Sequence, residues 1–235
     1  MFTGSTIVLT GVGGEGQVGE VVAQAFAEQG ASLVLVDRTA DKVEARAAAI
    51  VASGHSARGY ACDLTNADSV ADLVDRVRAN HGDTLHGLVH MAGGFAMSGP
   101  VGESSIDVWN RMIAINLNTA YLTTRAFLAL LRKGHGSIVL FSSEAALPGA
   151  KAANRSAYAI AKIGVATLMR AIAQEERATG VRANAVAPTS IRTAANIASM
   201  GDGVRYIERE AVADVVLFLC SQAASAISGE LLPLT

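Results

Sequence analysis

The stretch FSSEAALPGAKAANRSAYAIAK contains side chains whose types and spacing suit proton transfer. Tyr158 and Lys162 are four residues apart, so they share one face of a helix. A tyrosine has a reference pKa of about 10, and an ammonium group one turn away favours the phenolate and lowers that pKa. Ser142 and Ser143 end an apolar run, where a hydroxyl could hold a substrate oxygen near the phenol. The alternative interpretation is a solvated Tyr–Lys pair on a helix surface.

A second cluster is the glycine-rich stretch TGVGGEGQVG, residues 10–19, between an apolar run and a helical pattern. Gly11 directly follows the apolar run and is expected to make the tight turn, while Gly19 lets the next helix pack close to the sheet. Amides at the start of that helix, aided by its dipole, can bind a pyrophosphate. We expect Glu15 to point to solvent, because its charge would repel such a ligand. A flexible loop without a ligand is the alternative.

Asp37 ends the second apolar run, eighteen residues after Gly19. An acid in this position is typical of dinucleotide-binding βαβ units, where its carboxylate accepts hydrogen bonds from the adenosine ribose hydroxyls. It would repel a 2′-phosphate, and the glycine stretch contains no Arg or Lys to attract one. Arg38 slightly weakens this preference. We therefore expect NAD(H) as the preferred cofactor with NADP(H) as an alternative; Asp37 as an acid at a helix N-terminus remains a second interpretation.

The elements that position these clusters alternate between strand and helix. Short apolar runs predict strands at 6–10, 32–37, 57–62, 85–91, 137–142 and 181–187. Most lack polar–apolar alternation, as expected for parallel strands buried on both faces. Helical patterns lie at 19–29, 40–52, 66–80, 106–132, 156–179 and 210–221, and Thr65 with Asp68 predicts a capping box for the third of them. The pattern predicts an α/β fold: a Rossmann-type, doubly wound parallel sheet flanked by helices on both faces, as one domain over residues 1–235.

Composition narrows the function classes. The 235 residues carry a net charge of −2 with no basic stripe, which argues against nucleic-acid binding. Cys62 and Cys220 are far apart and form no CxxC motif, which fits a reducing cytoplasm and argues against a disulfide scaffold or a zinc site. The N-terminus lacks the features of a signal peptide, and we expect no membrane-spanning stretch.

Together, these motifs resemble those of the short-chain dehydrogenase/reductase family over nearly the whole chain. The matching segments are TGVGGEGQVG, HMAGG, AINLNTAY, SIVLFSS, YAIAK and VAPTSIRT. The resemblance implies that Tyr158 is the general acid/base, that Ser143 positions the substrate oxygen, and that Lys162 binds the nicotinamide ribose and tunes Tyr158. It also implies that Asn116 holds a water in a proton relay to Lys162. The alternative for Asn116, a poor residue for a helix interior, is that it caps a helix break.

The resemblance also implies a cofactor site and a small carbonyl or alcohol substrate. Asp63 would meet the adenine amino group, and Pro188, Ile191 and Thr193 would line the nicotinamide carboxamide. The full set of expected cofactor-binding residues is Gly11, Gly16, Gln17, Val18, Gly19, Asp37, Asp63, Leu64, Ala92, Gly93, Tyr158, Lys162, Pro188, Ile191 and Thr193.

Several residues depart from the family pattern. The glycine loop is two residues longer than usual, and His90 and Met91 replace the two asparagines of the family segment. We interpret His90 as a hydrogen-bonded strand-end histidine, with a partner near the cofactor as the alternative. The segment from Arg192 to Glu210, where the family has a longer substrate lid, is cut to about one helical turn plus a loop.

The short lid is similar to that of the dihydropteridine reductase branch, but that branch normally lacks the serine that this chain has. A ketone/alcohol couple is therefore favoured over a pterin. A pteridine-type reductase and a non-catalytic NAD(H)-binding sensor or scaffold are the alternative functions. The 106–132 and 156–179 segments carry more apolar residues than one sheet face needs, for example Leu122, Phe127, Leu128, Leu130 and Leu168. We expect these helices to pair in a homo-oligomer, a tetramer with D2 symmetry.

Overall fold

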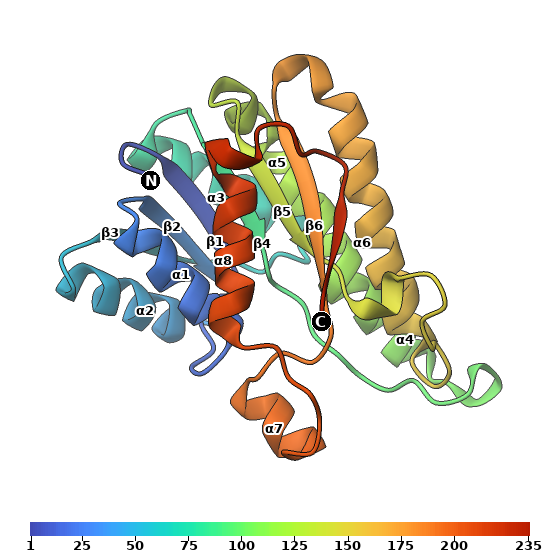
Figure 1. Cartoon of the computed structure of the whole chain (residues 1–235). Coiled ribbons are helices and arrows are strands. Elements are labelled where there is room, and N and C mark those ends of the chain that lie inside the picture. The colour runs from blue at the N-terminus through green and yellow to red at the C-terminus, as the bar shows by residue number, and fades with distance from the viewer.

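A seven-stranded parallel sheet forms the centre of the computed structural model, which describes all 235 residues (Figure 1). Its strand order is β3-β2-β1-β4-β5-β6-β7, so the direction of winding changes between β1 and β4. The strands are β1 (Thr6–Thr10), β2 (Ser32–Asp37), β3 (Ser56–Ala61), β4 (Gly87–His90), β5 (Ser137–Phe141), β6 (Arg182–Pro188) and β7 (Leu231–Leu234). The predicted doubly wound sheet and its six strands are confirmed.

Sequence reasoning missed the edge strand β7. Its sequence, LLPL, is short and contains a proline. Proline cannot donate to a strand ladder, so it is confined to edge strands and strand ends, and the pattern does not predict a strand. Pairing with the full-length β6 supplies the missing signal, because Leu231 to Leu234 run in register with Ala185 to Pro188.

Helices cover both faces of the sheet (Figure 1). The helices α1 (Val18–Glu28), α2 (Ala40–Ala52) and α8 (Arg209–Cys220) pack on one face, and α3 (Ala67–His81), α5 (Thr119–Lys133) and α6 (Ser156–Glu175) pack on the other. Alternate residues of β1 serve the two cores, with Ile7 and Leu9 facing the first group and Val8 the second. The five strands between β3 and β7 are therefore buried on both sides, which explains their largely continuous apolar sequences.

The predicted helix at 106–132 is not continuous. It consists of α4 (Ile106–Met112), a π-helical segment from Ile113 to Asn118, and α5. Such π-helical turns are rare and often occur at functional sites. Asn116 lies within this π-helical segment, where the regular α-helix is interrupted. It does not cap the break.

The predicted capping box of α3 is wrong. Asn66 is the N-cap, and its side chain accepts a hydrogen bond from the Ser69 amide at 2.9 Å. The hydroxyl of Thr65 instead donates to the carboxylate of Asp63 at 2.7 Å. Asparagine is at least as good an N-cap as threonine, which frees Thr65 for this contact.

One helix, α6, is long and apolar enough to span a membrane when judged by length and composition alone, contrary to the expectation from the sequence. Half of that stretch is buried inside the fold, where Val165, Met169 and Ile172 pack in the core. The same test is passed by core helices, so the finding is weak evidence for a membrane span.

The segment between β6 and α8 forms a short lid. It contains α7 (Ala194–Met200), which projects away from the rest of the molecule in Figure 1. Seven residues make about two turns, one more than expected. Ile191 and Ile207 form an isolated bridge that closes the base of this lid.

Candidate active site

Two cavities lie side by side at the carboxyl edge of the sheet and share Gly93 and Gly94. The larger, of about 610 Å³, is lined by Gly11, Asp37, Arg38, Cys62, Asp63, Leu64, Thr65, Ala92, Gly93, Gly94, Arg111, Ala114, Ile115 and Thr119. The smaller, of about 230 Å³, is lined by Met91, Gly93, Gly94, Phe95, Phe141, Ser142, Ser143, Tyr158, Lys162, Pro188, Thr189, Ile191 and Asn196. The fold thus brings the glycine turn and the Ser–Tyr–Lys cluster to one continuous edge.

Tyr158 faces the smaller cavity from the first turn of α6. Burial raises the pKa of its phenol, although the Ser143 side chain and the positive charge of Arg155 act to lower it. The expected net lowering of this pKa is therefore wrong for this structure, because desolvation of the phenolate outweighs its favourable neighbours. Phe95 packs edge-to-face on the tyrosine ring, with 5.0 Å between the ring centroids.

Lys162 lies one helical turn further along α6, with Nζ 5.8 Å from the centroid of the Tyr158 ring. Its ammonium group is buried and donates a hydrogen bond to the Phe141 carbonyl at 2.8 Å. Burial lowers its pKa to about 8, so the amine stays mostly protonated at neutral pH but loses its proton more readily than an exposed lysine. Lys162 is buried and Tyr158 is partly buried in the cavity wall, so the interpretation as a solvated surface pair is wrong.

The two serines at the end of β5 are used differently. Ser142 is buried and donates its hydroxyl to the Lys162 carbonyl at 2.8 Å, which ties the strand to α6. Ser143 lies against the phenol of Tyr158 and accepts a hydrogen bond from the Ala145 amide at 3.3 Å. The hydroxyl of Ser142 is thus used within the protein, whereas that of Ser143 lies at the Tyr158 phenol in the cavity wall.

Asn116 lies behind the backbone of Gly93 and Gly94. Its side-chain oxygen accepts from the Gly94 amide at 3.2 Å, and its nitrogen donates to the Gly94 and Met112 carbonyls, both at 3.0 Å. A Cβ on Gly93 would come within 2.6 Å of the Asn116 oxygen and 3.5 Å of Lys162 Nζ. Glycine is therefore needed where these two polar groups converge.

The backbone of the glycine turn packs as tightly as its position between a strand and a helix predicts. Gly11 has a φ of 75°, and a Cβ there would lie 2.7 Å from the Ala92 amide nitrogen. A Cβ on Gly19 would lie 2.4 Å from the Gly11 carbonyl oxygen, so both positions exclude side chains. Gln17 is the N-cap residue of α1, and Glu15 is exposed as expected.

Asp37 is fixed at the end of β2 by two amides. Its carboxylate accepts from the Gly13 amide at 2.8 Å and from the Thr39 amide at 3.2 Å. Any side chain at Gly13 would collide with the carboxylate. Arg38 lines the same cavity, so a positive charge lies near this acid.

His90 lies between two buried threonine hydroxyls, one at the end of β1 and the other at the start of α5. Thr10 Oγ1 lies 3.1 Å from His90 Nδ1, and Thr119 Oγ1 lies 3.2 Å from Nε2. The Thr119 hydroxyl donates to the Ile115 carbonyl, so it can only accept from Nε2–H, and Thr10 donates to Nδ1. Burial lowers the histidine pKa to about 3, with a further contribution from Lys162. His90 is thus a neutral, fully paired strand-end histidine, as expected.

Some predicted site residues do not line either cavity. Asn116 is almost completely buried. Thr193 is also buried, and its hydroxyl caps the N-terminus of α7. The others are Gly16, Gln17, Val18 and Gly19, which form the start of α1. Asp63 lines the larger cavity, and its hydrogen bonds with Thr65 lower the pKa of its carboxyl.

Sequence reasoning missed several residues near the site, among them Phe95, Arg155 and Arg209. Phe95 follows the HMAGG segment directly, and Arg155, paired with Glu144 at 3.0 Å, precedes Tyr158 by one turn, so spacing alone could have identified these. Arg209 begins α8, yet its Nη1 lies 4.0 Å from the Cβ position of Gly16. No sequence spacing predicts this approach, because 193 residues separate the two.

These features define a dinucleotide-dependent class of protein. The parallel sheet with a strand-order reversal, the glycine turn that excludes side chains, and the carboxylate after β2 fit a nicotinamide dinucleotide. The adjoining cavity holds a tyrosine, a lysine and a serine suited to proton transfer.

Comparison with known proteins supports the same class. A family model described as enoyl-(acyl carrier protein) reductase matches residues 11–234. The chain is 36% identical over 226 residues to a cis-4-hydroxycyclohexanecarboxylate dehydrogenase of Sinomonas cyclohexanicum, covering 92% of this chain and 89% of that one. A short-chain type dehydrogenase/reductase from Mycobacterium ulcerans has a TM-score of 0.91 and 32% identity, covering 99% and 89%.

A putative NAD(P)-dependent gluconate 5-dehydrogenase from Beutenbergia cavernae, whose structure has NADP bound at low occupancy, has a TM-score of 0.88 and 30% identity, covering 98% of this chain and 95% of that one. The chain belongs to the short-chain dehydrogenase/reductase family and is an NAD(P)-dependent oxidoreductase.

Proposed function

We propose that this protein interconverts a ketone and a secondary alcohol, with Tyr158 as general acid/base. The observation that carries the proposal is the convergence of Ser143, Tyr158 and Lys162 on one cavity next to the glycine turn. When bound, the nicotinamide cofactor carries the hydride, and the protein supplies orientation and proton transfer.

In the reducing direction, Tyr158 donates its proton to the carbonyl oxygen while the Ser143 hydroxyl holds that oxygen. The raised pKa of Tyr158 keeps the phenol protonated at neutral pH, which is the state needed for donation. Lys162, with a pKa of about 8, can supply or accept a proton at the same pH. Oxidation of the alcohol uses the same groups in reverse.

Asn116 acts from behind the cavity wall. Its side-chain oxygen and the Lys162 ammonium both lie close to the position that a Cβ on Gly93 would occupy. We propose that it orders a water that passes protons to Lys162. The sharp limit on side-chain size at Gly93 supports this close arrangement.

We propose NAD(H) as the preferred cofactor. The Asp37 carboxylate, held by two backbone amides, is placed to accept hydrogen bonds from ribose hydroxyls and to repel a 2′-phosphate. Arg38 reduces that repulsion, and the Beutenbergia cavernae neighbour was solved with NADP, so NADP(H) remains an alternative. Gly11, Asp63, Leu64, Ala92, Gly93, Pro188 and Ile191 would line the rest of the site.

The substrate class follows from the cavity walls and the short lid. Phe95, Met91, Pro188 and Ile191 present apolar surface to the small cavity, and Asn196 of the short helix α7 also lines it. Together with a relative named for a hydroxycyclohexanecarboxylate, this supports an alicyclic ketone or alcohol as substrate.

The decisive experiment measures NADH oxidation with a panel of cyclic and acyclic ketones. Tyr158→Phe should lower kcat by a factor of at least about 10² while leaving the dissociation constant of NADH nearly unchanged, because only the transferable proton is lost. Tyr121→Phe, at an exposed tyrosine on α5, is the matched control and should retain full activity. An unmodified protein that binds NADH but turns over no substrate would favour the sensor function instead.

For assembly we propose a tetramer with D2 symmetry, though not through the residues expected from sequence. Phe127 and Leu130 are buried in the monomer core, and Leu122, Leu128 and Leu168 pack against it. The exposed apolar residues on α4, α5 and α6 are instead Ile106, Trp109, Tyr121, Ile160 and Ile163.

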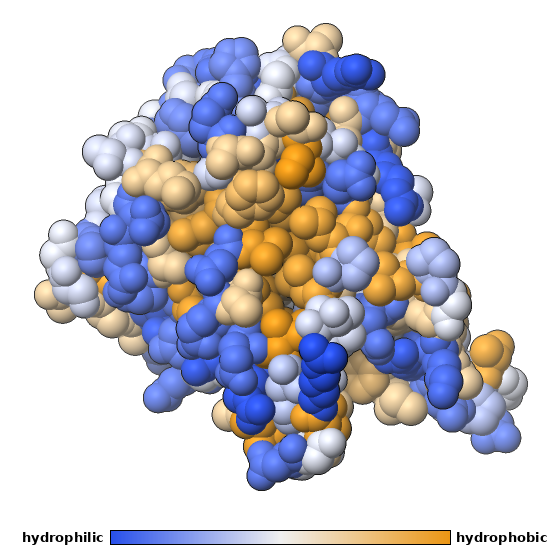
Figure 2. Space-filling model, viewed as in Figure 1, coloured by the Kyte–Doolittle hydropathy of each residue, from blue (hydrophilic) through white to orange (hydrophobic).

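A second apolar face supports a second two-fold contact. Figure 2 shows it in the middle of the side that carries α8 and β7. Phe218 is 41% exposed there, and the edge strand β7 is only partly covered. Two distinct apolar faces are what D2 assembly requires.

Both cysteines are free and buried, which is compatible with the cytoplasmic location we propose.

A further inference from the structure

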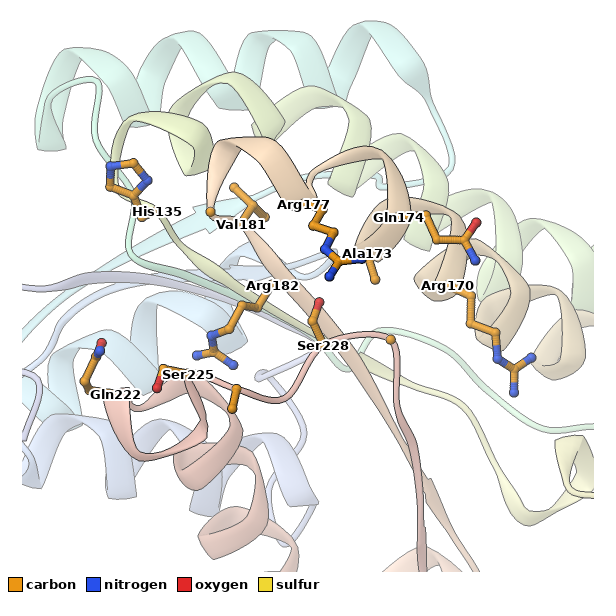
Figure 3. Close-up of a pocket in the computed structure, with 13 residues that line it drawn as sticks. His135, Arg170, Ala173, Gln174, Arg177, Val181, Arg182, Gln222, Ser225 and Ser228 are labelled. Atoms are coloured by element: carbon orange, nitrogen blue, oxygen red, sulfur yellow. The ribbon is translucent and has the colours of Figure 1, made fainter.

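A third cavity, lined mainly by polar residues, lies at the opposite end of the strands from the active site. Its volume is about 770 Å³, within the range of small-molecule sites. It is lined by His135, Arg170, Ala173, Gln174, Arg177, Gly180, Val181, Arg182, Gln222, Ser225, Ala226, Ser228 and Gly229 (Figure 3). Arg182 begins β6 and Pro188 ends it, so about 20 Å of strand separates this cavity from the active site.

The cavity carries positive charge that no carboxylate neutralises. Three arginines line it, and no Asp or Glu does. Arg170 and Arg177 form no ion pair, and no protein hydrogen bond engages their guanidinium groups. The nearby carboxylate of Glu176 is bound by Arg132 through two hydrogen bonds of 2.5 and 2.8 Å. A surplus of guanidinium charge in a cavity is the usual basis for recognising phosphate or carboxylate groups.

Arg182 is held rigidly at the base of the cavity. It donates to the carbonyls of Leu219, Ser221 and Ile227 at 2.8, 3.1 and 3.3 Å. Those carbonyls bear no net charge, so the positive charge of Arg182 remains uncompensated. Its Nε hydrogen and one Nη2 hydrogen have no partner in the structure and are free for a ligand.

Further polar groups surround these arginines. His135 Nδ1 lies 2.8 Å from the Thr179 carbonyl, so Nδ1 carries the hydrogen and Nε2 is left without a protein partner. The backbone of His135 has a φ of 48°, uncommon for a residue other than glycine, and Gly180 leaves room for its ring. Figure 3 shows Arg177 in the turn that follows α6 and Arg182 on β6, with Ser228 close to both.

The number of arginines indicates the charge of the ligand. Arg170 lies on α6, Arg177 in the 3-10 turn that follows α6, and Arg182 at the start of β6, so three guanidinium groups from three elements face one cavity. One phosphate near Arg177 and Arg182 would leave Arg170 without a partner. We infer that this cavity is a binding site for a small metabolite bearing two phosphate groups, held by Arg170, Arg177 and Arg182.

The test measures pyrophosphate binding by isothermal titration calorimetry. The protein is saturated with NADH beforehand, because a pyrophosphate could otherwise enter the cofactor site. At low, matched ionic strength, pyrophosphate should bind with 1:1 stoichiometry and a dissociation constant below about 1 mM, and more tightly than inorganic phosphate. Heats indistinguishable from those of a sodium chloride control would overturn the inference.

The variants separate the site from general charge effects. Arg170→Gln combined with Arg177→Gln should weaken pyrophosphate binding at least tenfold, while Arg125→Gln, at an exposed arginine on α5 without an ion pair, should change it less than twofold. The double variant keeps Arg182 and its structural hydrogen bonds, and unchanged ketone reduction would verify that it folds. Unchanged pyrophosphate binding in that variant would refute the site, and an effect of Arg177→Gln without any effect of Arg170→Gln would refute the two-phosphate ligand.

Discussion

The buried histidine at the end of β4 should make the free energy of unfolding decrease as the solution becomes mildly acidic. His90 has a folded-state pKa of about 3 against an ordinary value of 6.5. Below pH 6.5 the unfolded chain binds a proton that the folded chain cannot, so the stabilisation is present above pH 6.5 and is lost as the pH falls toward 3. Each pH unit in this window is worth about 1.4 kcal/mol, so lowering the pH from 7.5 to 5.0 should cost about 2 kcal/mol from this group.

The assay is urea unfolding at fixed protein concentration and several pH values between 7.5 and 5.0. The lower limit stays above the ordinary pKa values of Asp and Glu, so most carboxylates remain charged. With a slope of about 2 kcal/mol per molar urea, the unfolding midpoint should fall by about 1 M over this range. Holding the protein concentration fixed removes any contribution from assembly.

The matched variant is His90→Asn, which keeps hydrogen-bonding capacity but does not titrate. It should be less stable at pH 7.5, because two buried threonine contacts are altered, yet lose about 2 kcal/mol less than the parent on acidification. Burial also lowers the pKa of His81, so some acid sensitivity should remain in both proteins. Equal acid sensitivity in the parent and in His90→Asn would show that His90 already titrates freely, and the reasoning would fail.

Three further changes test the cofactor site. The parent should prefer NADH over NADPH by about thirtyfold in kcat/KM, equivalent to about 2 kcal/mol, and Asp37→Ser should remove most of that gap by improving NADPH. Arg209→Gln should raise the dissociation constants of both cofactors by a similar factor of about 3 to 10, because Arg209 approaches the glycine turn at Gly16, away from the ribose. Gly93→Ala should lower kcat more than tenfold and destabilise the fold by about 1–3 kcal/mol, because its Cβ would displace the Asn116 side chain.

Steady-state kinetics and fluorescence titration of NADH check the first two changes, and urea unfolding checks the third. Equal use of both cofactors by the parent would mean that Asp37 does not face the ribose. A selective loss of NADPH alone in Arg209→Gln would place that arginine at the 2′-phosphate. Full activity in Gly93→Ala would show that the Asn116 contact is dispensable.

Local sequence signals were sufficient to predict the sheet and to single out the side chains that line the smaller cavity. Buried parallel strands have continuous apolar sequences, and six of the seven strands were predicted from them. Tyr158 and Lys162 were recognisable from their spacing, because helical periodicity places residues four apart on one face. Gly11 and Asp37 were recognisable because Gly11 directly follows β1 and Asp37 is the last residue of β2.

Other features depend on packing that no short pattern records. The π-helical segment around Asn116 still looks like a continuous helix in sequence, and the sign of the Tyr158 pKa shift depends on how deeply the phenol is buried. The sequence suggested Leu130 as a contact between subunits, but the structure buries it in the core of the monomer.

The sequence by itself determined the class of fold and the family, since these are set by periodicity, by turn residues and by spacing within single elements. Only the tertiary structure decided which groups meet across elements: Arg209 near Gly16, His90 between two threonines, and Arg182 beside Arg177. The physical reason is that desolvation and charge depend on the distances between distant segments, and those distances exist only after the chain has packed.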